Sequence, residues 1–157
     1  MLTGIWGRDM TVVTQLIQER SDRGLTRRDG HREARTDVQL SLVIPVYNGV
    51  GRLPLMLEEV RTFLEHHREL GEVVFVDDGS SDDSASLLRA FVADVPRTRL
   101  IALPRNRGKG YAVRRGMLAA RGAFRIFTDA DLAYPLEDLE GIVLELQRGA
   151  DVVVACR

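Results

Sequence analysis

The stretch Leu40-Ser41-Leu42-Val43-Ile44-Pro45-Val46-Tyr47-Asn48-Gly49 contains the pattern that sets the fold class of this chain. Its first seven residues are almost continuously apolar, which is typical of a strand buried on both faces of a sheet. The Asn-Gly pair at its end is typical of a turn. Apolar residues then recur at helical spacing from Leu53 to Leu70, with Pro54 suited to a first turn. The unit is therefore a strand, a turn and a helix.

The same unit repeats toward the C-terminus. Alternating patterns predict a helix capped by one of residues 81–83 and further helices that begin at residues 109 and 135. The predicted strands between and after them cover 73–76, 99–103, 124–128 and 151–155. Strands and helices that alternate in this way indicate an α/β fold with a mostly parallel sheet and helices on both faces. Ligands of such sheets bind beyond the carboxyl ends of the strands, so polar clusters matter most where strands end.

Composition is that of one globular domain. The 157 residues are 45% hydrophobic and 29% charged, and the formal net charge of -1 excludes a strongly basic nucleic-acid binder. No apolar run reaches the roughly 18 residues of a membrane-spanning helix. The single cysteine, Cys156, excludes an internal disulfide and favours a reducing compartment. We therefore expect a cytoplasmic protein with no nucleic-acid partner.

The N-terminal segment differs from the rest of the chain. Between Glu19 and Asp37 almost every side chain is polar or charged, and such a stretch buries too little surface to offset its ordering entropy. We expect residues 1–37 to be a mobile leader, with one or two helical turns over 10–17. The folded domain is expected to be 38–157.

Polar clusters follow the first and second predicted strands. After the first, Pro45, Tyr47 and Asn48 can form a wall for a flat base, although an ordinary strand-to-helix loop explains them as well. After the second, Asp77 and Asp78 stand at the edge of a buried sheet, where unpaired carboxylates are costly. The next residues already offer three caps for the following helix. The two carboxylates are therefore available to a base or a ribose.

Two more clusters follow the third and fourth strands. In Arg105-Asn106-Arg107-Gly108-Lys109-Gly110, glycines flank the only lysine of the chain at a helix N-terminus, which suits an anion as well as a solvated turn. The Walker spacing is absent. In Thr128-Asp129-Ala130-Asp131-Leu132, alternate carboxylates suit a divalent cation that also borrows phosphate oxygens, or form an acidic turn.

Together the four clusters indicate a site for a nucleoside diphosphate. Phosphorelay receivers also gather acids at strand ends, but their phosphate-accepting aspartate follows the third strand, where this chain has Arg105 and Lys109. Haloacid-type phosphatases place two aspartates after the first strand, where this chain has Tyr47 and Asn48. Neither class fits the order of the clusters.

From about Leu40 to Arg157 the sequence resembles family 2 glycosyltransferases of the GT-A fold. It resembles most the dolichyl-phosphate β-glucosyltransferases and related polyprenyl-phosphate sugar transferases. The motifs that carry the resemblance are Val43-Ile44-Pro45-Val46-Tyr47-Asn48, Val76-Asp77-Asp78-Gly79-Ser80, Asn106-Arg107-Gly108-Lys109-Gly110 and Asp129-Ala130-Asp131.

The resemblance implies a Rossmann-like GT-A nucleotide-binding core and an inverting, metal-dependent sugar transfer. The donor would be a UDP- or GDP-sugar such as UDP-glucose, the cofactor Mg²⁺ or Mn²⁺, and the acceptor a polyprenyl or dolichyl phosphate. Such an acceptor implies a chain that is peripheral on the cytoplasmic face of a membrane. The resemblance also implies a C-terminal acceptor half, with a carboxylate base, which we expect this chain to lack.

The resemblance also implies roles for individual residues. Asp131 would hold the metal, and Asp129 would lie near both the metal and the ribose, so these two are the expected catalytic residues. Arg105 would stabilise the departing diphosphate, and Lys109 would close the donor site. The implied donor-binding residues are Pro45, Tyr47, Asn48, Asp77, Asp78, Gly79, Arg105, Asn106, Gly108, Lys109, Gly110, Asp129 and Ala130.

Other functions remain open at this point. A non-catalytic nucleotide-sugar-binding module, or an inactive truncated transferase, would share all four motifs. A nucleotidyltransferase would need a glycine-rich loop after the first strand, which Tyr47-Asn48-Gly49-Val50-Gly51 match poorly. The sequence leaves the oligomeric state undetermined.

Overall fold

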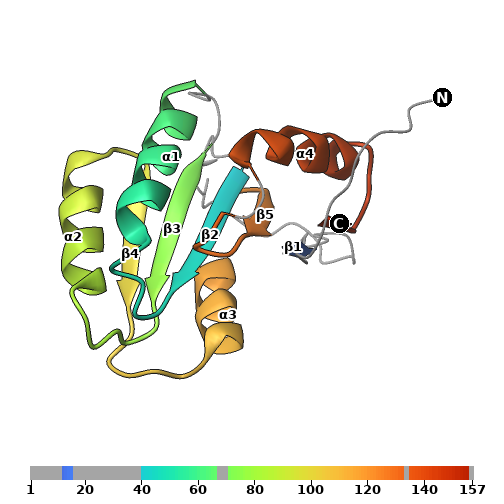
Figure 1. Cartoon of the computed structure of the whole chain (residues 1–157). Helices are drawn as coiled ribbons and strands as arrows, with labels where there is room; N and C mark the ends of the chain where they lie inside the picture. The colour runs from blue at the N-terminus through green and yellow to red at the C-terminus, as the bar shows by residue number, and fades with distance from the viewer. Residues whose placement is uncertain (1–11, 16–39, 67–70, 133–134, 156–157) are drawn as a thin grey trace, which may run out of the picture.

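A computed structural model describes residues 12–15, 40–66, 71–132 and 135–155 of the chain. Its centre is a sheet of four parallel strands in the order β4-β3-β2-β5 (Figure 1). The strands are β2 (Leu40–Val46), β3 (Glu72–Asp77), β4 (Thr98–Ala102) and β5 (Phe124–Phe127). These bounds agree with the predicted strands to within one residue at each end. The predicted parallel α/β sheet is confirmed.

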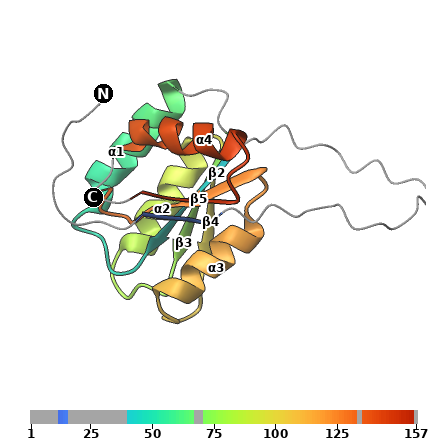
Figure 2. The ribbon, with the colours of Figure 1, turned by 90° about the vertical axis from the view of Figure 1, so that its right-hand side faces the viewer.

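Helices cover both faces of this sheet, as predicted (Figure 2). The helices α1, α2 and α4 share one hydrophobic core with the sheet, and α3 packs on the opposite face. Among the described helices, none combines the length and apolar character needed to cross a membrane. Their bounds are α1 Leu53–His66, α2 Ser84–Asp94, α3 Lys109–Ala119 and α4 Leu139–Gln147, with a short 3-10 turn, η1, at Leu136–Asp138.

Glycine allows α3 to approach the sheet closely. Gly116 faces β2 and β3, and a Cβ atom there would lie 2.3 Å from Cγ1 of Val43 and 2.9 Å from Cγ2 of Val76. Both valines are fully buried. The helix that begins at Lys109 is thereby held against the centre of the sheet, which fixes the position of its N-terminus at the carboxyl edge.

Two sequence predictions about the chain ends are wrong. The strand predicted at the C-terminus, β6 (Val152–Ala155), pairs antiparallel with β1 (Val12–Gln15) in a separate two-stranded sheet, instead of joining the parallel one. Of residues 10–17, for which helical turns were predicted, the structure describes 12–15, and these form a strand, in keeping with their β-branched Val-Val-Thr sequence. The rest of the predicted leader, residues 1–37, lies outside the described residues.

A buried polar network closes the amino ends of the strands. The carboxylate of Glu72, on β3, accepts hydrogen bonds from Ser41 Oγ (2.9 Å), the backbone N–H of Arg121 (2.7 Å) and Nε of Arg99 (2.7 Å). Ser41 Oγ in turn accepts from the N–H of Gly122 (2.8 Å). One carboxylate therefore joins the starts of β2 and β3 to the turn between α3 and β5.

Candidate functional site

A cavity of about 310 Å³ opens at the carboxyl edge of the sheet. The strand order reverses between β2 and β5, and this switch point is where ligands of open α/β sheets bind. Eight of the fourteen predicted donor-binding and metal residues line this cavity, together with three residues that were not predicted. Its lining residues are Pro45, Val46, Tyr47, Arg52, Asp78, Asn106, Lys109, Ala112, Asp129, Ala130 and Asp131.

The remaining predicted residues lie around this cavity but do not line it. Asn48 lines a second cavity of about 390 Å³, which shares the walls formed by Tyr47, Arg52 and Asp131. The exposed side chain of Arg105 is not part of either lining. The same holds for Asp77, Gly79, Gly108 and Gly110.

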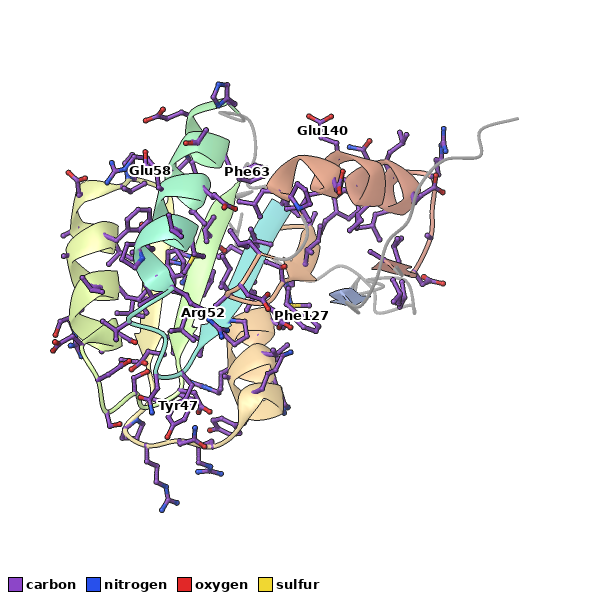
Figure 3. The ribbon with its side chains drawn as sticks, in the orientation of Figure 1. Tyr47, Arg52, Glu58, Phe63, Phe127 and Glu140 are labelled. Atoms are coloured by element: carbon purple, nitrogen blue, oxygen red, sulfur yellow. The ribbon has the colours of Figure 1, made fainter. Side chains whose placement is uncertain are left out.

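The loop after β2 is attached to the loop after β3, which fixes the position of Tyr47. The N–H of Asn48 donates to Ser80 Oγ (2.9 Å), and its Oδ1 accepts from the N–H of Ser81 (2.8 Å). Asn48 takes a φ of +47°, which asparagine tolerates better than most residues. Tyr47, which precedes it, is 51% exposed at the edge where the strands end (Figure 3). The backbone that carries Tyr47 is therefore held in place, and the exposed ring is open to a ligand.

Asp82 makes a second connection between these loops. Its carboxylate accepts from the N–H of Val50 (3.1 Å) and the N–H of Ser84 (3.0 Å). Hydrogen bonding to Ser84, and more weakly to Val50, lowers the pKa of Asp82. Because the folded-state pKa is depressed, the stabilisation is present above the ordinary carboxyl pKa and is lost as pH falls through the lowered value.

The buried pair Asp77 and Asp78 already has partners within the protein, which corrects the expectation that both are free for a ligand. The two carboxylate oxygens of Asp78 accept from the N–H groups of Arg107 (2.9 Å) and Gly108 (2.8 Å). Oδ1 of Asp77 accepts from the N–H of Ser80 (3.2 Å). Asp78 therefore anchors the loop that leads into α3, and Asp77 closes the turn after its own strand.

Replacement of these two aspartates separates their roles. We expect Asp78→Ala to free two backbone N–H groups, to accelerate amide hydrogen exchange at Arg107 and Gly108, and to weaken UDP binding. Each lost hydrogen bond to a charged group costs about 1.5–3 kcal/mol. Asp77→Ala should leave exchange at those two amides unchanged. Equal exchange in the two variants would contradict the anchoring role of Asp78.

Gly79 allows the same loop to lie against the end of β3. Its φ is +69°, and a Cβ atom there would lie 2.3 Å from the carbonyl carbon of Arg105 and 2.6 Å from the backbone nitrogen of Asn106. Backbone atoms cannot move aside as a flexible side chain can. Glycine at this position is therefore required by packing and brings Asn106 to the cavity, although Gly79 itself does not line it.

Lys109 and Asp129 form an ion pair across the cavity. Nζ of Lys109 lies 2.7 Å from Oδ1 and 2.8 Å from Oδ2 of Asp129, and the lysine side chain is 60% exposed. Oδ1 is buried but forms no hydrogen bond of good geometry with the described residues, although it is within ion-pair distance of the ammonium. The only lysine of the chain thus balances the carboxylate that follows β5.

The carboxylates of Asp129 and Asp131 fit a divalent cation that is completed by a ligand. Both line the same cavity, and the buried Oδ1 of Asp129 lacks a good hydrogen-bond donor. Within the described residues, no cluster of three or more His, Cys, Asp or Glu side chains forms a complete metal site. Mg²⁺ typically takes one or two carboxylates and substrate phosphates instead of a full protein cage. The donor set suits that kind of site.

Arg52 is the site residue that sequence reasoning missed. It precedes α1, lines both cavities and is exposed (Figure 3). Within the described part of the chain its guanidinium makes no ion pair. Its place three residues after the Asn-Gly turn was the available signal, but the abundance of arginine in the sequence hid it. Val46 and Ala112 were missed as apolar lining.

Comparisons with known proteins agree with this geometry. The family model described as Glycosyl transferase family 2 matches residues 41–157. Dolichyl-phosphate beta-glucosyltransferase of Dictyostelium discoideum is 35% identical over 130 residues, which are 76% of this chain and 39% of that protein. Undecaprenyl-phosphate 4-deoxy-4-formamido-L-arabinose transferase of Yersinia enterocolitica is 39% identical over 121 residues, 76% of this chain and 37% of that protein.

Solved structures show the same fold. The mannosyltransferase PcManGT from Pyrobaculum calidifontis, in complex with GDP-Man and Mn²⁺, matches with a TM-score of 0.58 at 26% identity, over 68% of this chain and 31% of that one. S. aureus TarS 1-349 matches with a TM-score of 0.56 at 23% identity, over 71% of this chain and 33% of that one. The chain thus spans between a third and two fifths of the length of the curated relatives it matches.

Proposed function

Since this chain belongs to glycosyl transferase family 2, we propose that it binds a nucleotide-diphosphate sugar in the cavity between β2 and β5 and takes part in sugar transfer to a polyprenyl phosphate. The observation that carries the proposal is the content of one cavity. An exposed aromatic ring, the carboxylates of Asp129 and Asp131, a lysine and an arginine line it together. These groups match the parts of such a donor, which are a flat base, a diphosphate and a cation.

Each lining group has a proposed partner on the donor. Tyr47 and Pro45 would contact the base, since the exposed ring offers a flat apolar face beside the strand end. Asp129 and Asp131 would hold Mg²⁺ or Mn²⁺, which supplies charge neutralisation for the departing diphosphate when bound. Arg52 would contribute a bidentate contact to phosphate oxygens.

Lys109 has a second proposed role once the donor is bound. In the described structure its ammonium balances Asp129 at 2.7 Å. A cation shared by the carboxylates would repel the ammonium, and the flexible stem of lysine allows it to turn toward the diphosphate. The backbone of the loop stays fixed by Asp78, so this movement needs only the side chain.

A phosphate acceptor suits an inverting transfer at this site. The second pKa of a phosphate monoester is near 6, so the acceptor is mostly dianionic at about pH 7 and brings its own nucleophilic oxygen. The oxygen would form a bond to the anomeric carbon as the bond to the diphosphate breaks, on the opposite face. No side chain need then remove a proton. The names of the relatives, which act on dolichyl and undecaprenyl phosphates, support this acceptor class.

A non-catalytic nucleotide-sugar-binding module is the second candidate. The donor cavity is built entirely from residues 45–131 and would be complete in such a module. The two candidates therefore share donor binding and differ in transfer.

One pair of measurements tests both candidates. We expect calorimetry to show saturable binding of UDP that requires Mn²⁺, because the two carboxylates and the diphosphate share the cation. Radiolabelled UDP-glucose is then incubated with a polyprenyl phosphate, and label in the lipid fraction supports the transferase. Binding without transfer supports the binding module. The absence of metal-dependent binding to both UDP and GDP would contradict the donor site.

A further inference from the structure

Basic and acidic residues are strongly separated along the chain. From Val95 to Thr128 there is no aspartate or glutamate, although the chain as a whole carries 23 acidic and 22 basic residues. This one segment forms β4, α3 and β5 with their connections. Its nine basic residues are Arg97, Arg99, Arg105, Arg107, Lys109, Arg114, Arg115, Arg121 and Arg125.

Some of these basic side chains are paired within the protein, and others have no carboxylate partner among the described residues. Arg99 pairs with Glu72, and Arg125 donates to backbone carbonyls. Five exposed arginines have no carboxylate partner among the described residues. They lie on the loop before α3, on α3 itself and just after it, and are Arg105, Arg107, Arg114, Arg115 and Arg121.

Four of these arginines lie on α3 or directly beside its ends, together with two less polar side chains of the helix. We call this set the α3 basic face. Arg107 stacks over the ring of Tyr111 at 4.5 Å. Arg114 and Arg115 follow Tyr111 by one helical turn, and Leu118, which is 53% exposed, follows them by another. The members of the α3 basic face are Arg107, Tyr111, Arg114, Arg115, Leu118 and Arg121.

The α3 basic face points away from the sheet and from the other helices. The buried residues of α3 are Ala112, Gly116 and Met117, which pack on β2, β3 and β5. Figure 2 shows α3 alone on its side of the sheet, with α1, α2 and α4 on the other. On that other side, the helices α1 and α2 carry more acidic residues than arginines. The acidic residues are Glu58, Glu59, Glu65 and Asp94, and the arginines are Arg61 and Arg89. The two sides of the sheet therefore differ in the sign of their charge.

We propose that the α3 basic face docks this domain on an anionic phospholipid surface. Arginines near such a surface are attracted to its headgroups. The exposed Leu118 and the half-buried Tyr111 among them suit the boundary between headgroups and acyl chains. A nucleic acid would use the charge but not the exposed Leu118.

The position of the face relative to the cavity supports this partner. The α3 basic face begins at Arg107, two residues before Lys109, which lines the cavity. A membrane on this face would hold the cavity near the plane of the headgroups, where the phosphate of a polyprenyl phosphate lies. The link between docking and the polyprenyl phosphate rests on the proposed function. Docking on the membrane itself requires neither nucleotide nor cation.

Vesicle binding tests the docking surface without a sugar donor. The whole chain is sedimented with vesicles of phosphatidylcholine that contain about 30 mol% phosphatidylserine, and with phosphatidylcholine alone. We expect binding only to the anionic vesicles. It should be lost in about 1 M NaCl, where the Debye length falls to about 3 Å. Arg114→Gln/Arg115→Gln should weaken binding about 25-fold, since each arginine contributes roughly fivefold.

A matched control removes the same charge from the other side of the sheet. Arg89 and Arg148 are exposed on α2 and after α4, so Arg89→Gln/Arg148→Gln should change vesicle affinity less than twofold, as neither lies on the face. Equal losses in the two double variants would overturn the proposal, as would equal binding to both vesicle types. Tighter binding to duplex DNA than to the anionic vesicles would also overturn it. Both double variants should bind UDP as the unmodified chain does, so that a loss of vesicle binding is distinguished from a loss of the donor site.

Discussion

Asp131→Asn is expected to abolish Mn²⁺-dependent UDP binding while the domain stays folded. The exposed carboxylate of Asp131 lines both cavities beside Asp129, and an amide cannot neutralise a cation. Mutation of residues that only hydrogen-bond to metal ligands already lowers metal affinity about 10–100-fold. Removal of a direct ligand should therefore lower the metal-dependent affinity for UDP at least about 100-fold. Titration of UDP by calorimetry, with Mn²⁺ and with EDTA, measures the loss.

The control for this variant is a carboxylate outside the cavity. Asp83 precedes α2 without a side-chain cap bond, so Asp83→Asn should leave UDP affinity unchanged. The free energy of unfolding should shift by less than about 1 kcal/mol in either variant, because both side chains are on the surface. Unchanged metal-dependent binding by Asp131→Asn would remove the cation from this site.

Glu72→Ala should produce a large loss of stability. The buried carboxylate accepts three hydrogen bonds and pairs with Arg99 at 2.7 Å. Its removal leaves the hydroxyl of Ser41 and the N–H of Arg121 without an acceptor, and the guanidinium without a counter-charge. Breaking a fully buried pair in this way costs about 3–5 kcal/mol. Because the Arg99 side chain is 31% exposed, we expect a loss near the lower end, about 3 kcal/mol, which lowers the melting temperature of a domain of this size by roughly 10 °C.

Urea unfolding followed by circular dichroism measures this effect. Glu72→Gln keeps one acceptor oxygen and should lose less than Glu72→Ala. Glu59→Ala removes an exposed carboxylate from α1 and should change the free energy of unfolding by less than about 0.5 kcal/mol. If all three variants unfolded at the same urea concentration, the network at the amino ends of the strands would not stabilise the fold.

Much of the candidate site could be predicted because parallel strands bring their carboxyl ends to one edge. Tyr47, Asp78, Asn106 and Asp129 are far apart in the chain, yet each follows a different strand of the same sheet. Locating the strands from their apolar runs was therefore enough to place these residues near one another. Arg52 was not predicted because it precedes a helix, and its place three residues after the Asn-Gly turn was too weak a signal to distinguish it from the many other arginines of the chain.

The pairing at the chain ends could not be predicted in the same way. The run Val152–Ala155 is apolar enough for a strand, and the sequence indicated one. Its partner, β1, lies far away along the chain, and short apolar runs carry no information on which strand they join or in which direction. The choice between a fifth parallel strand and a separate antiparallel pair depends on packing between distant segments.

The apolar runs and the residues that follow them specified the parallel sheet, the edge that holds the site and most of its members. These features are local, because periodicity and strand-end chemistry act over a few residues. The tertiary structure decided which groups are engaged. Both oxygens of Asp78 are used by a loop about 30 residues away, and Lys109 meets Asp129 across the cavity. Hydrogen bonds and ion pairs of this kind depend on distances that only the folded chain creates.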